Sequence, residues 1–451
     1  MIDLPNDQNK RFFRDIFPYP SPPKIKFDAE PVPMNLPEKI WITDTTFRDG
    51  QQAREPYTAD QVVHLYDLMH KLGGQSNIIK YTEFFLYTKE DRRAIETCLE
   101  RGYEYPIVTS WIRATDSDLD LVKKVNMSET GILSSLSDYH IVYKFGWTRE
   151  QTIENHLSVA ENCLKEEIIP RCHIEDCTRA DIDDVVLPFV QRLMKLSEEY
   201  GLPTKVRICD TLGLGVSDPY ATLPRSIPKL IHKLTTEGGI PNEWLEFHGH
   251  NDFHQSISAS TAAWLYGCCG NNGTLLGIGE RAGNTPIDGL VFQLLQLKDD
   301  LKVDTKVIKE IAEYYEEIGF TVPEFYPLIG SNYPLTRAGV HADGMVKNPE
   351  IYASFDFEKS LGTPMNIIVG RYSGASGIAW KINKLLGLKR HEWIHKNDPR
   401  VLIINEYILD LYEAGRVTAM SDKEMIALVR THFPELIKSP ERPLIYSVHS
   451  K

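Results

Sequence analysis

The stretch "WITDTTFRDGQQAREP", residues 41–56, changes from apolar to strongly polar within a few positions. Its first residues have the aromatic and β-branched composition of a buried strand. Its second half sets Arg48 beside Asp49, directly before Gly50. A loop needs polar residues, but it does not need a guanidinium beside a carboxylate at the end of a buried strand. The stretch therefore predicts a strand whose carboxyl end carries chemically active groups.

Strand-like and helical segments alternate from residue 39 to about residue 297. The candidate strands are "KIWIT", "NIIKYT", "YPIVTS", "GILSSL", "IIPRCHI", "TKVRIC", "WLEFHGH" and "GTLLGIG". Segments with helical periodicity lie between them, such as "TADQVVHLYDLMHKLG". Repeated strand–helix units predict a parallel sheet, and eight of them predict a closed (β/α)8 TIM barrel. A doubly wound open sheet is the alternative.

The segments that flank the predicted barrel differ from it in composition. Residues 1–37 include "FPYPSPPKIKFDAEPVPMNLP", and proline at this density prevents helices and central strands. We expect an extended N-terminal arm there, either loose or lying across a partner. The barrel is expected over residues 38–300, a linker and subdomain over 301–385, and a helical subdomain over 386–451. The fold class is therefore α/β, a TIM barrel followed by a mainly helical C-terminal region.

The composition argues against several classes of protein. The formal net charge of −13 gives no bulk attraction to nucleic acid or to anionic membranes. No apolar run approaches the roughly 18 residues of a membrane span, and the first residues lack the order of a signal peptide. The seven cysteines include no C-x-x-C pair, which argues against a zinc cluster or a disulfide framework. We therefore expect a cytoplasmic protein with reduced thiols that binds neither nucleic acid nor membranes.

Two histidines at the seventh candidate strand indicate a metal site. His248 and His250 in "HGHND" are two positions apart, so both side chains point to one face of a strand. In a closed barrel, strand 8 lies between strands 7 and 1, which brings Asp49 and the Asn284 of "GIGERAGN" to the same rim. Such mixed nitrogen and oxygen ligands suit Mn²⁺ or Co²⁺, with Mg²⁺ and Zn²⁺ as alternatives. Arg48 beside them can stabilise negative charge that develops on a substrate oxygen.

Five motifs occur in an order that resembles a known family. They are "DTTFRDGQQ", "HGHND", "GIGERAGN", "AGVHADG" and "GRYSG". Together they resemble the acyltransferases of the DRE-TIM metallolyase superfamily, which include 2-isopropylmalate, homocitrate, citramalate and Re-citrate synthases. The resemblance covers residues 39–379. It implies a TIM barrel, an acetyl-CoA donor, a 2-oxo acid acceptor and a divalent metal.

The resemblance also implies roles for individual residues. The implied metal ligands are Asp49, His248, His250 and Asn284. The implied substrate contacts are Gln52, Arg171, His173 and Thr211. The implied catalytic residues are Arg48, Glu175, His341 and Tyr352. The pair of His341 and Tyr352 resembles one that homocitrate synthases supply from the neighbouring subunit, so we expect a homodimer with shared active sites.

Two segments depart from the family pattern. His173 stands in "RCHIEDCTRAD" where homocitrate synthases carry a small serine, and "IIKYTEFF" retains only Glu83 as a weak match. Arg171 and His173 suit an acceptor with a second carboxylate, whereas a 2-isopropylmalate synthase needs an apolar pocket. The residues after Gly387 are also too few for the leucine-binding regulatory domain of typical 2-isopropylmalate synthases.

The acceptor is expected to be a 2-oxo dicarboxylate. The larger His173 shortens the pocket and favours oxaloacetate over 2-oxoglutarate. The proline-rich arm, "FRDGQQAREPYT" and His173 are most similar to the Re-citrate synthases. We therefore expect condensation of acetyl-CoA with oxaloacetate to citrate and CoA. The alternatives are a homocitrate synthase, a 2-isopropylmalate or citramalate synthase, a lyase of the same superfamily, and a metal-stabilised binding protein without catalytic activity.

Overall fold

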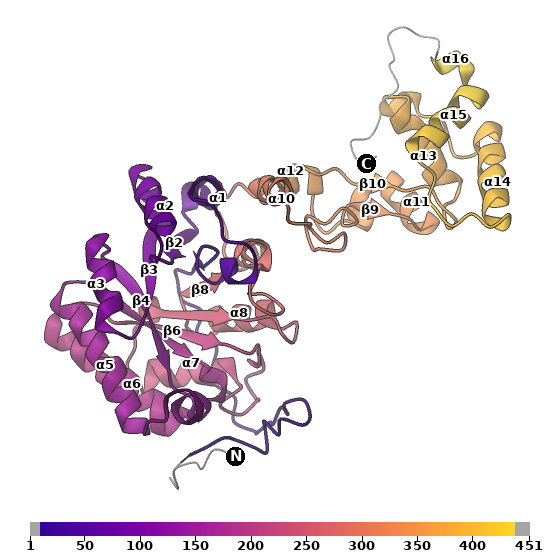
Figure 1. Cartoon of the computed structure of the whole chain (residues 1–451). Coiled ribbons are helices and arrows are strands. Elements are labelled where there is room, and N and C mark those ends of the chain that lie inside the picture. The colour runs from indigo at the N-terminus through magenta and orange to yellow at the C-terminus, as the bar shows by residue number, and fades with distance from the viewer. Residues whose placement is uncertain (1–9, 438–451) are drawn as a thin grey trace. The chain divides into compact units, whose positions relative to one another are not determined.

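Figure 1 shows the computed structural model of the chain, which describes residues 10–437. Eight parallel strands form a closed barrel in chain order, and β1 completes it by pairing with both β2 and β8. The strands are β1 (Trp41–Asp44), β2 (Ile79–Phe84), β3 (Ile107–Arg113), β4 (Glu129–Ser135), β5 (Ile169–Glu175), β6 (Lys205–Asp210), β7 (Leu245–Gly249) and β8 (Gly270–Gly273). The predicted TIM barrel is confirmed, and the open sheet is excluded.

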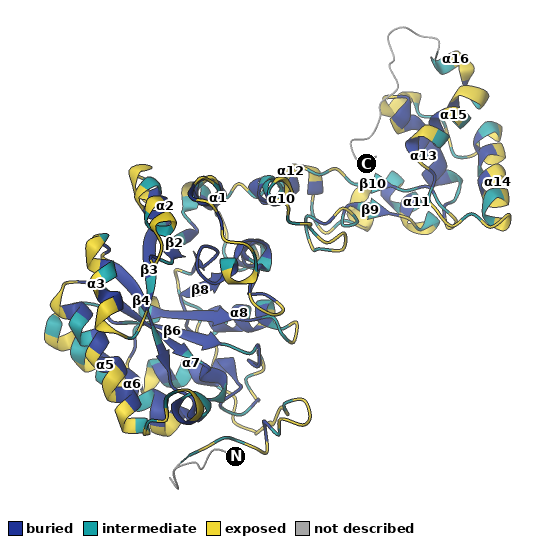
Figure 2. Cartoon of the chain, viewed as in Figure 1, coloured by how far each residue is buried: buried dark blue, intermediate teal, exposed yellow. Residues whose placement is uncertain are grey.

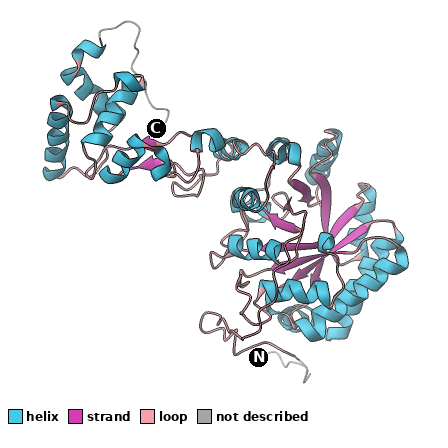
Figure 3. Cartoon of the chain, turned by 180° about the vertical axis from the view of Figure 1, so that it is seen from behind, coloured by secondary structure: helices cyan, strands magenta, loops and turns pink. Residues whose placement is uncertain are grey.

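A helix follows each strand on the outside of the barrel, where Figure 3 shows cyan helices around magenta strands. The helices are α1 (Ala59–Gly73), α2 (Lys89–Glu100), α3 (Asp116–Lys124), α5 (Arg149–Lys165), α6 (Leu187–Tyr200), α7 (Ile227–Thr236), α8 (Ser256–Leu265) and α9 (Ile287–Leu297), with a short α4 (Asp138–His140) before α5. Capping boxes begin three of them, at Thr58, Thr88 and Thr148. Because these boxes satisfy the free N–H groups of the first turn, they set where each preceding loop ends.

The eighth strand lies earlier than the sequence pattern predicts. The predicted strand "GTLLGIG" is wrong, because these residues form a loop with a short 3-10 turn at Leu275–Gly277. β8 instead has the sequence Gly-Asn-Asn-Gly, which has low strand propensity. Tertiary bonding explains its position: β8 pairs in register with β1, and the buried Asn272 Nδ2 donates to Thr43 Oγ1 at 2.9 Å. Cross-strand hydrogen bonds thus stabilise a polar strand that the local amino-acid sequence does not predict.

The N-terminal arm, residues 10–37 as described, lies against the barrel of its own chain. Tyr139 Oη donates to the carbonyl of Phe12 at 2.7 Å, and Arg225 Nη1 donates to the carbonyl of Lys24 at 2.6 Å. Tyr139 lies in the short helix α4 that follows β4, and Arg225 lies in the loop that follows β6. The extended arm is therefore packed rather than loose.

The chain divides into two compact units after Val307. The elements from there onward are α10 (Val307–Glu317), β9 (Leu335–Thr336), α11 (Gly339–Lys347), α12 (Phe357–Leu361), β10 (Asn366–Ile367), α13 (Ala375–Leu385), α14 (Pro399–Glu413), α15 (Asp422–His432) and α16 (Pro434–Ile437). One apolar cluster packs α13 against α14 and α15 through Ile378, Ile404 and Met425. The mainly helical C-terminal region is confirmed, while the exact boundaries of the arm and subdomains stay predictions.

Burial follows the barrel architecture. Figure 2 shows the strands in dark blue and exposed residues on the outer sides of the surrounding helices. Charged and polar side chains are also buried inside the barrel, among them Glu83, Arg171 and Arg207. Among the described residues, no helix combines the length and apolar character that a membrane span needs.

Candidate active site and metal centre

Asp49, His248 and His250 lie together at the carboxyl ends of β1 and β7. Asp49 Oδ2 is 3.3 Å from His248 Nε2 and 3.5 Å from His250 Nε2. The two Nε2 atoms are 3.3 Å apart, and all three side chains are buried. Three possible ligand atoms therefore converge on one point.

Asn272 determines the tautomer of His248. His248 Nδ1 lies 2.7 Å from Asn272 Oδ1, while Nδ2 of the same amide donates to Thr43. Since an amide oxygen only accepts, His248 Nδ1 carries the proton and Nε2 presents its lone pair. Asn284 brings a second amide to this point: its Nδ2 donates to Asp49 Oδ2 at 2.6 Å, and its buried Oδ1 bonds to none of the described residues.

The electrostatics of these groups fit a divalent cation. His248 Nε2 and Asp49 Oδ2 are both acceptors and lie 3.3 Å apart, with Asn284 Nδ2 at 3.4 Å from the first and 2.6 Å from the second, so positive charge placed between them would be stabilised. Two imidazole nitrogens with a carboxylate oxygen form the mixed donor set that borderline and hard divalent ions prefer, whereas Asn284 presents its amide nitrogen to this point. The four residues predicted as ligands are thus brought together, and their ligand role stays a prediction.

Arg48 is buried between two carboxylates. Its Nε donates to Glu83 Oε2 at 2.8 Å, and its Nη1 donates to Asp49 Oδ1 at 3.0 Å. Glu83 Oε2 also accepts from Thr45 Oγ1 at 2.9 Å. Burial opposes ionisation of Glu83, but the guanidinium groups of Arg207 and Arg48 outweigh it and hold the pKa of Glu83 well below its usual range. Glu83 therefore stays ionised and holds Arg48 in one orientation.

Buried ion pairs continue from Glu83 along the inside of the barrel. Arg207 Nη1 lies 2.9 Å from Glu83 Oε1, and Arg207 Nε donates to Glu246. Glu246 Oε2 is 3.8 Å from Arg171 Nε, and Arg171 pairs in turn with Glu129. We call the whole set, which includes the Glu129 partner Lys205, the buried ion-pair network. Its eight members are Arg48, Arg171, Lys205, Arg207, Asp49, Glu83, Glu129 and Glu246.

A comparison with family profiles agrees with this geometry. The profile described as HMGL-like matches residues 39–314, which includes the whole barrel. The chain belongs to the HMGL-like family. The resemblance inferred from the five sequence motifs is thereby confirmed.

Individual relatives place the HMGL-like chain more narrowly. It is 48% identical over 440 residues to a citrate (Re)-synthase from Clostridium kluyveri, covering 97% of each chain. It is 36% identical to a 2-phosphinomethylmalate synthase from Streptomyces hygroscopicus, covering 96% of this chain and 98% of that protein. Among solved structures, hydroxymethylglutaryl-CoA lyase from Pseudomonas aeruginosa matches with a TM-score of 0.51 at 19% identity, over 64% of this chain and 96% of that one. This last likeness shows the shared fold alone.

Arg171, His173 and Glu175 alternate on β5 of the HMGL-like barrel, yet each has its own partners. Arg171 lies nearest the amino end and pairs with Glu129 and Glu246. Its charge is therefore matched inside the protein and does not by itself require a substrate carboxylate. His173 follows Arg171 by two residues and is also buried. Its Nε2 lies 3.3 Å from a carboxylate oxygen of Glu83.

Glu175 ends β5 with one carboxylate oxygen fully engaged. Its Oε2 accepts from Ser135 Oγ and from Lys144 Nζ at 2.8 Å, and it lies 3.5 Å from His140 Nδ1. Burial opposes ionisation, but His140, Lys144 and Ser135 together lower the pKa of Glu175. All three contacts within the described chain go to Oε2, so Oε1 is available to accept a proton.

Thr211 and Gln52 also lie at the carboxyl rim. Thr211 follows β6, and its Oγ1 accepts from the backbone N–H of Asp176 at 2.7 Å. Gln52 lies in a 3-10 turn, Gly50–Ala53, and is exposed. Their predicted substrate contacts stay predictions.

His341 and Tyr352 are brought together in the C-terminal unit. Their ring centroids are 4.3 Å apart, with His341 on α11 and Tyr352 just after it. Tyr352 packs over Gly344, where an added Cβ would lie 2.5 Å from the Tyr352 ring. Both residues of the pair are exposed. The expected pair therefore exists, while its catalytic role stays a prediction.

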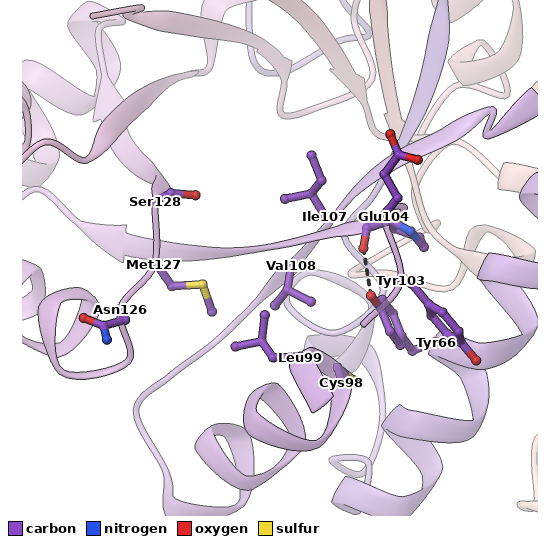
Figure 4. A pocket seen from close by; sticks show the side chains of 11 residues that line it. Tyr66, Cys98, Leu99, Tyr103, Glu104, Ile107, Val108, Asn126, Met127 and Ser128 are labelled. Carbon is purple, nitrogen blue, oxygen red and sulfur yellow. Dashed lines mark hydrogen bonds between the residues drawn. The ribbon is translucent and has the colours of Figure 1, made fainter. Parts of the chain in front are cut away.

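A separate cavity lies at the other end of the barrel. Figure 4 shows it where β3 begins, with the Tyr66 hydroxyl bonded to the carbonyl of Pro106 at 2.8 Å. Its volume is about 170 Å³, and its lining includes Met127 and Ser128, which precede β4. Because the candidate catalytic residues follow the carboxyl ends of the strands, this cavity is not part of their site.

Sequence reasoning missed several residues of this site. Asn272 was hidden by the misplaced eighth strand. Arg207, Glu246 and Glu129 are charges inside the strand segments "KVRICD", "LEFHG" and "ETGILSS". A charge at an inward position of a buried strand is itself the signal, because such a group requires a partner inside the barrel.

Proposed function

We propose that the chain condenses the acetyl group of acetyl-CoA with oxaloacetate and releases citrate and CoA. The observation that carries this function is the 48% identity with a citrate (Re)-synthase over 97% of both chains. The chain is thus an enzyme of the acyltransferase class. The buried arrangement of Arg48, Asp49, His248 and His250 supplies groups suited to that chemistry.

Asp49, His248, His250 and Asn284 are the residues that would hold a divalent metal. When bound there, the metal would orient the 2-oxo acid through its keto oxygen and adjacent carboxylate and polarise the keto group. Arg48 adjoins this point with its Nε and Nη1 already bonded, and Nη2 makes no bond within the described chain. Nη2 is therefore placed to donate to the oxygen on which charge develops.

The remaining steps need groups that move protons. His341, supported by Tyr352, accepts a proton from the methyl group of acetyl-CoA. The methyl carbon then forms a bond to the keto carbon of the acceptor, and the keto oxygen becomes a hydroxyl after protonation. Water next attacks the thioester carbon and displaces the CoA thiol. Glu175, through its available Oε1, is our candidate for accepting the proton of this water.

Charge balance favours an acceptor with two carboxylates. The buried ion-pair network contains four cations and four carboxylates, so it is neutral by itself. A divalent metal beside Asp49 adds two positive charges. A 2-oxo dicarboxylate offsets both charges, whereas a monocarboxylate leaves one uncompensated in a buried site, which is costly.

His173 is our candidate for selecting the shorter acceptor. Oxaloacetate and 2-oxoglutarate differ by one methylene group, a difference that binding alone resolves by roughly 10- to 200-fold. The buried imidazole of His173 contacts Glu83, the same carboxylate that holds Arg48. A ring in this position occupies space that the additional methylene of 2-oxoglutarate would need.

We also propose that the protein is a homodimer in which the His341 pair completes the partner's barrel site. Val340, next to His341, is 78% exposed, and Phe325 is 84% exposed. Phe325 and His341 line one hollow of about 490 Å³. Exposed apolar side chains around a catalytic candidate are typical of a surface that another surface covers.

The test is CoA release from acetyl-CoA with oxaloacetate, 2-oxoglutarate, pyruvate and 2-oxoisovalerate, with products identified by mass spectrometry. We expect oxaloacetate to give the highest kcat/KM and 2-oxoisovalerate to be poorer by about 10⁴-fold. Arg48→Ala should abolish turnover, whereas the matched surface variant Arg93→Ala should retain it. A higher kcat/KM for 2-oxoglutarate would make the protein a homocitrate synthase and refute our interpretation of His173.

A further inference from the structure

The ring of His173 lies directly over a glycine of the neighbouring strand. A Cβ added to Gly131 on β4 would lie 2.6 Å from both Cε1 and Nε2 of His173. The same Cβ would lie 3.0 Å from Glu83 Oε1. Real Cβ atoms do not approach other atoms as closely as 2.6 Å, so any side chain at position 131 displaces the ring.

Strand register shows in which direction the ring points. His173 pairs with Leu133, whereas Gly131 pairs with Arg171, two residues nearer the amino end. The imidazole is therefore folded back towards the amino end of the barrel, away from the metal-ligand candidates at the carboxyl rim. Burial and the nearby Arg207 lower the pKa of His173 well below its usual range, so the ring is neutral.

We propose that Gly131 is a specificity-determining residue that sets the depth of the acceptor site by making room for the His173 ring. This inference rests on the proposed condensation. With glycine at 131, the His173 ring lies towards the amino end of the barrel and leaves a site deep enough for oxaloacetate. A methyl group at 131 would push the ring towards the carboxyl rim and press on Glu83, which holds Arg48.

The pair of residues therefore behaves as one unit. Replacing His173 by serine removes the ring and opens the site towards the amino end. Replacing Gly131 by alanine in that background adds a methyl group where the ring was, so it meets no obstacle from residue 173. The effect of Gly131→Ala should thus depend on which residue occupies position 173.

The experiment is a double-mutant cycle with Gly131→Ala, His173→Ser and the double variant. We expect Gly131→Ala to lower kcat/KM for oxaloacetate by roughly 10- to 100-fold in the wild-type background, the scale of an overpacked or misfitted methyl group. In the His173→Ser background the loss should be less than about threefold. Gly73→Ala is the matched control, because a Cβ there would lie 3.8 Å from Ile79 N and 3.9 Å from Ile78 N, both ordinary contacts.

Acceptor preference separates specificity from a general loss of activity. His173→Ser should shift the ratio of kcat/KM values towards 2-oxoglutarate by about tenfold or more. Adding Gly131→Ala should reverse part of that shift, because the methyl group refills part of the opened space. If Gly131→Ala leaves this ratio unchanged in both backgrounds, Gly131 does not determine specificity.

Thermal unfolding keeps the test independent of the proposed activity. The thermal midpoint should fall more with Gly131→Ala alone than with the same change beside His173→Ser. If Gly131→Ala does not fold, recovery of folding in the double variant supports the coupling, and failure of both variants overturns it. Equal losses in both backgrounds also overturn it. If midpoints couple but no variant or wild type makes citrate, the proposed function fails while the steric coupling stands.

Discussion

The charged residues of the barrel site and the proposed proton-transfer pair lie in opposite environments. Arg48, Asp49 and Glu83 are buried and held by hydrogen bonds and ion pairs within one barrel. His341 and Tyr352 are exposed on the C-terminal unit, where their rings contact each other. The barrel therefore fixes its charges before any substrate binds, which is the arrangement that stabilises a developing charge most effectively. A proton-transfer pair on an exposed surface would gain from a second surface that excludes water around it.

Removing the proposed metal site should have the largest effect. Asp49→Asn or exhaustive chelation should lower kcat by about 10³-fold or more, because several kcal/mol of charge stabilisation are lost. Added Mn²⁺ or Co²⁺ should restore the chelated wild type but not the variant. The measurement is CoA release together with the metal content of the protein. Asp60→Asn, an exposed carboxylate on α1, is the matched control.

Full activity in protein shown by elemental analysis to be free of divalent metal would refute the metal site. It would also remove the reason for the close approach of His248 and Asp49. The barrel site would then differ from the exposed pair of His341 and Tyr352 only in how its side chains are packed and paired, and not in binding a metal.

His341→Ala should lower kcat by roughly 10²- to 10⁴-fold, the usual contribution of a general acid–base group. The thermal midpoint should stay close to that of the wild type, since the side chain is exposed. His391→Ala, another exposed histidine of the same unit, is the control.

Mixing the His341→Ala and Arg48→Ala proteins tests the proposed sharing of active sites. A heterodimer then contains one site with both residues intact, so part of the activity should return. Proven subunit exchange without any recovery would show that each site uses the His341 of its own chain.

Glu83→Gln should lower kcat by about 100-fold, because the amide no longer holds Arg48 by charge. It should also destabilise the fold by about 3–5 kcal/mol, since the buried Arg207 loses a charged partner. Denaturant unfolding and steady-state kinetics measure the two effects. Glu96→Gln on the exposed side of α2 is the control, and equal behaviour of both variants would refute the role of the network.

The buried ion-pair network should also make the stability of the fold depend on pH, an effect smaller than the loss of stability caused by Glu83→Gln. The folded-state pKa of Glu83 lies below the ordinary value of 4.5, so its ionisation stabilises the fold above about pH 4.5 and this contribution is lost as the pH falls. The difference in thermal midpoint between wild type and Glu83→Gln should therefore stay constant from neutral pH down to about pH 4.5 and shrink progressively as the pH falls below that value towards the lower folded-state pKa. A difference that is independent of pH would assign the effect to packing instead of charge.

The candidate metal ligands could be predicted because each lies at the end of a strand or in the loop that follows it. Parallel strands place their carboxyl ends on one rim, so Asp49, His248 and His250 had to be close once the barrel was counted correctly. The misplaced eighth strand did not disturb this result, because Asn284 returns to the rim through a loop. The misplaced eighth strand did hide Asn272, which orients His248, because no local pattern marks a Gly-Asn-Asn-Gly segment as a strand.

The sequence by itself determined the barrel, the order of its motifs and the residue types that meet at its rim. These depend on periodicity and on chemistry that neighbouring residues carry. Only the tertiary structure decided how the buried charges pair, where the His173 ring lies and that the N-terminal arm packs on its own barrel. The physical reason is that these features depend on contacts between residues far apart in the chain. Register and barrel closure set such contacts, and no local propensity encodes them.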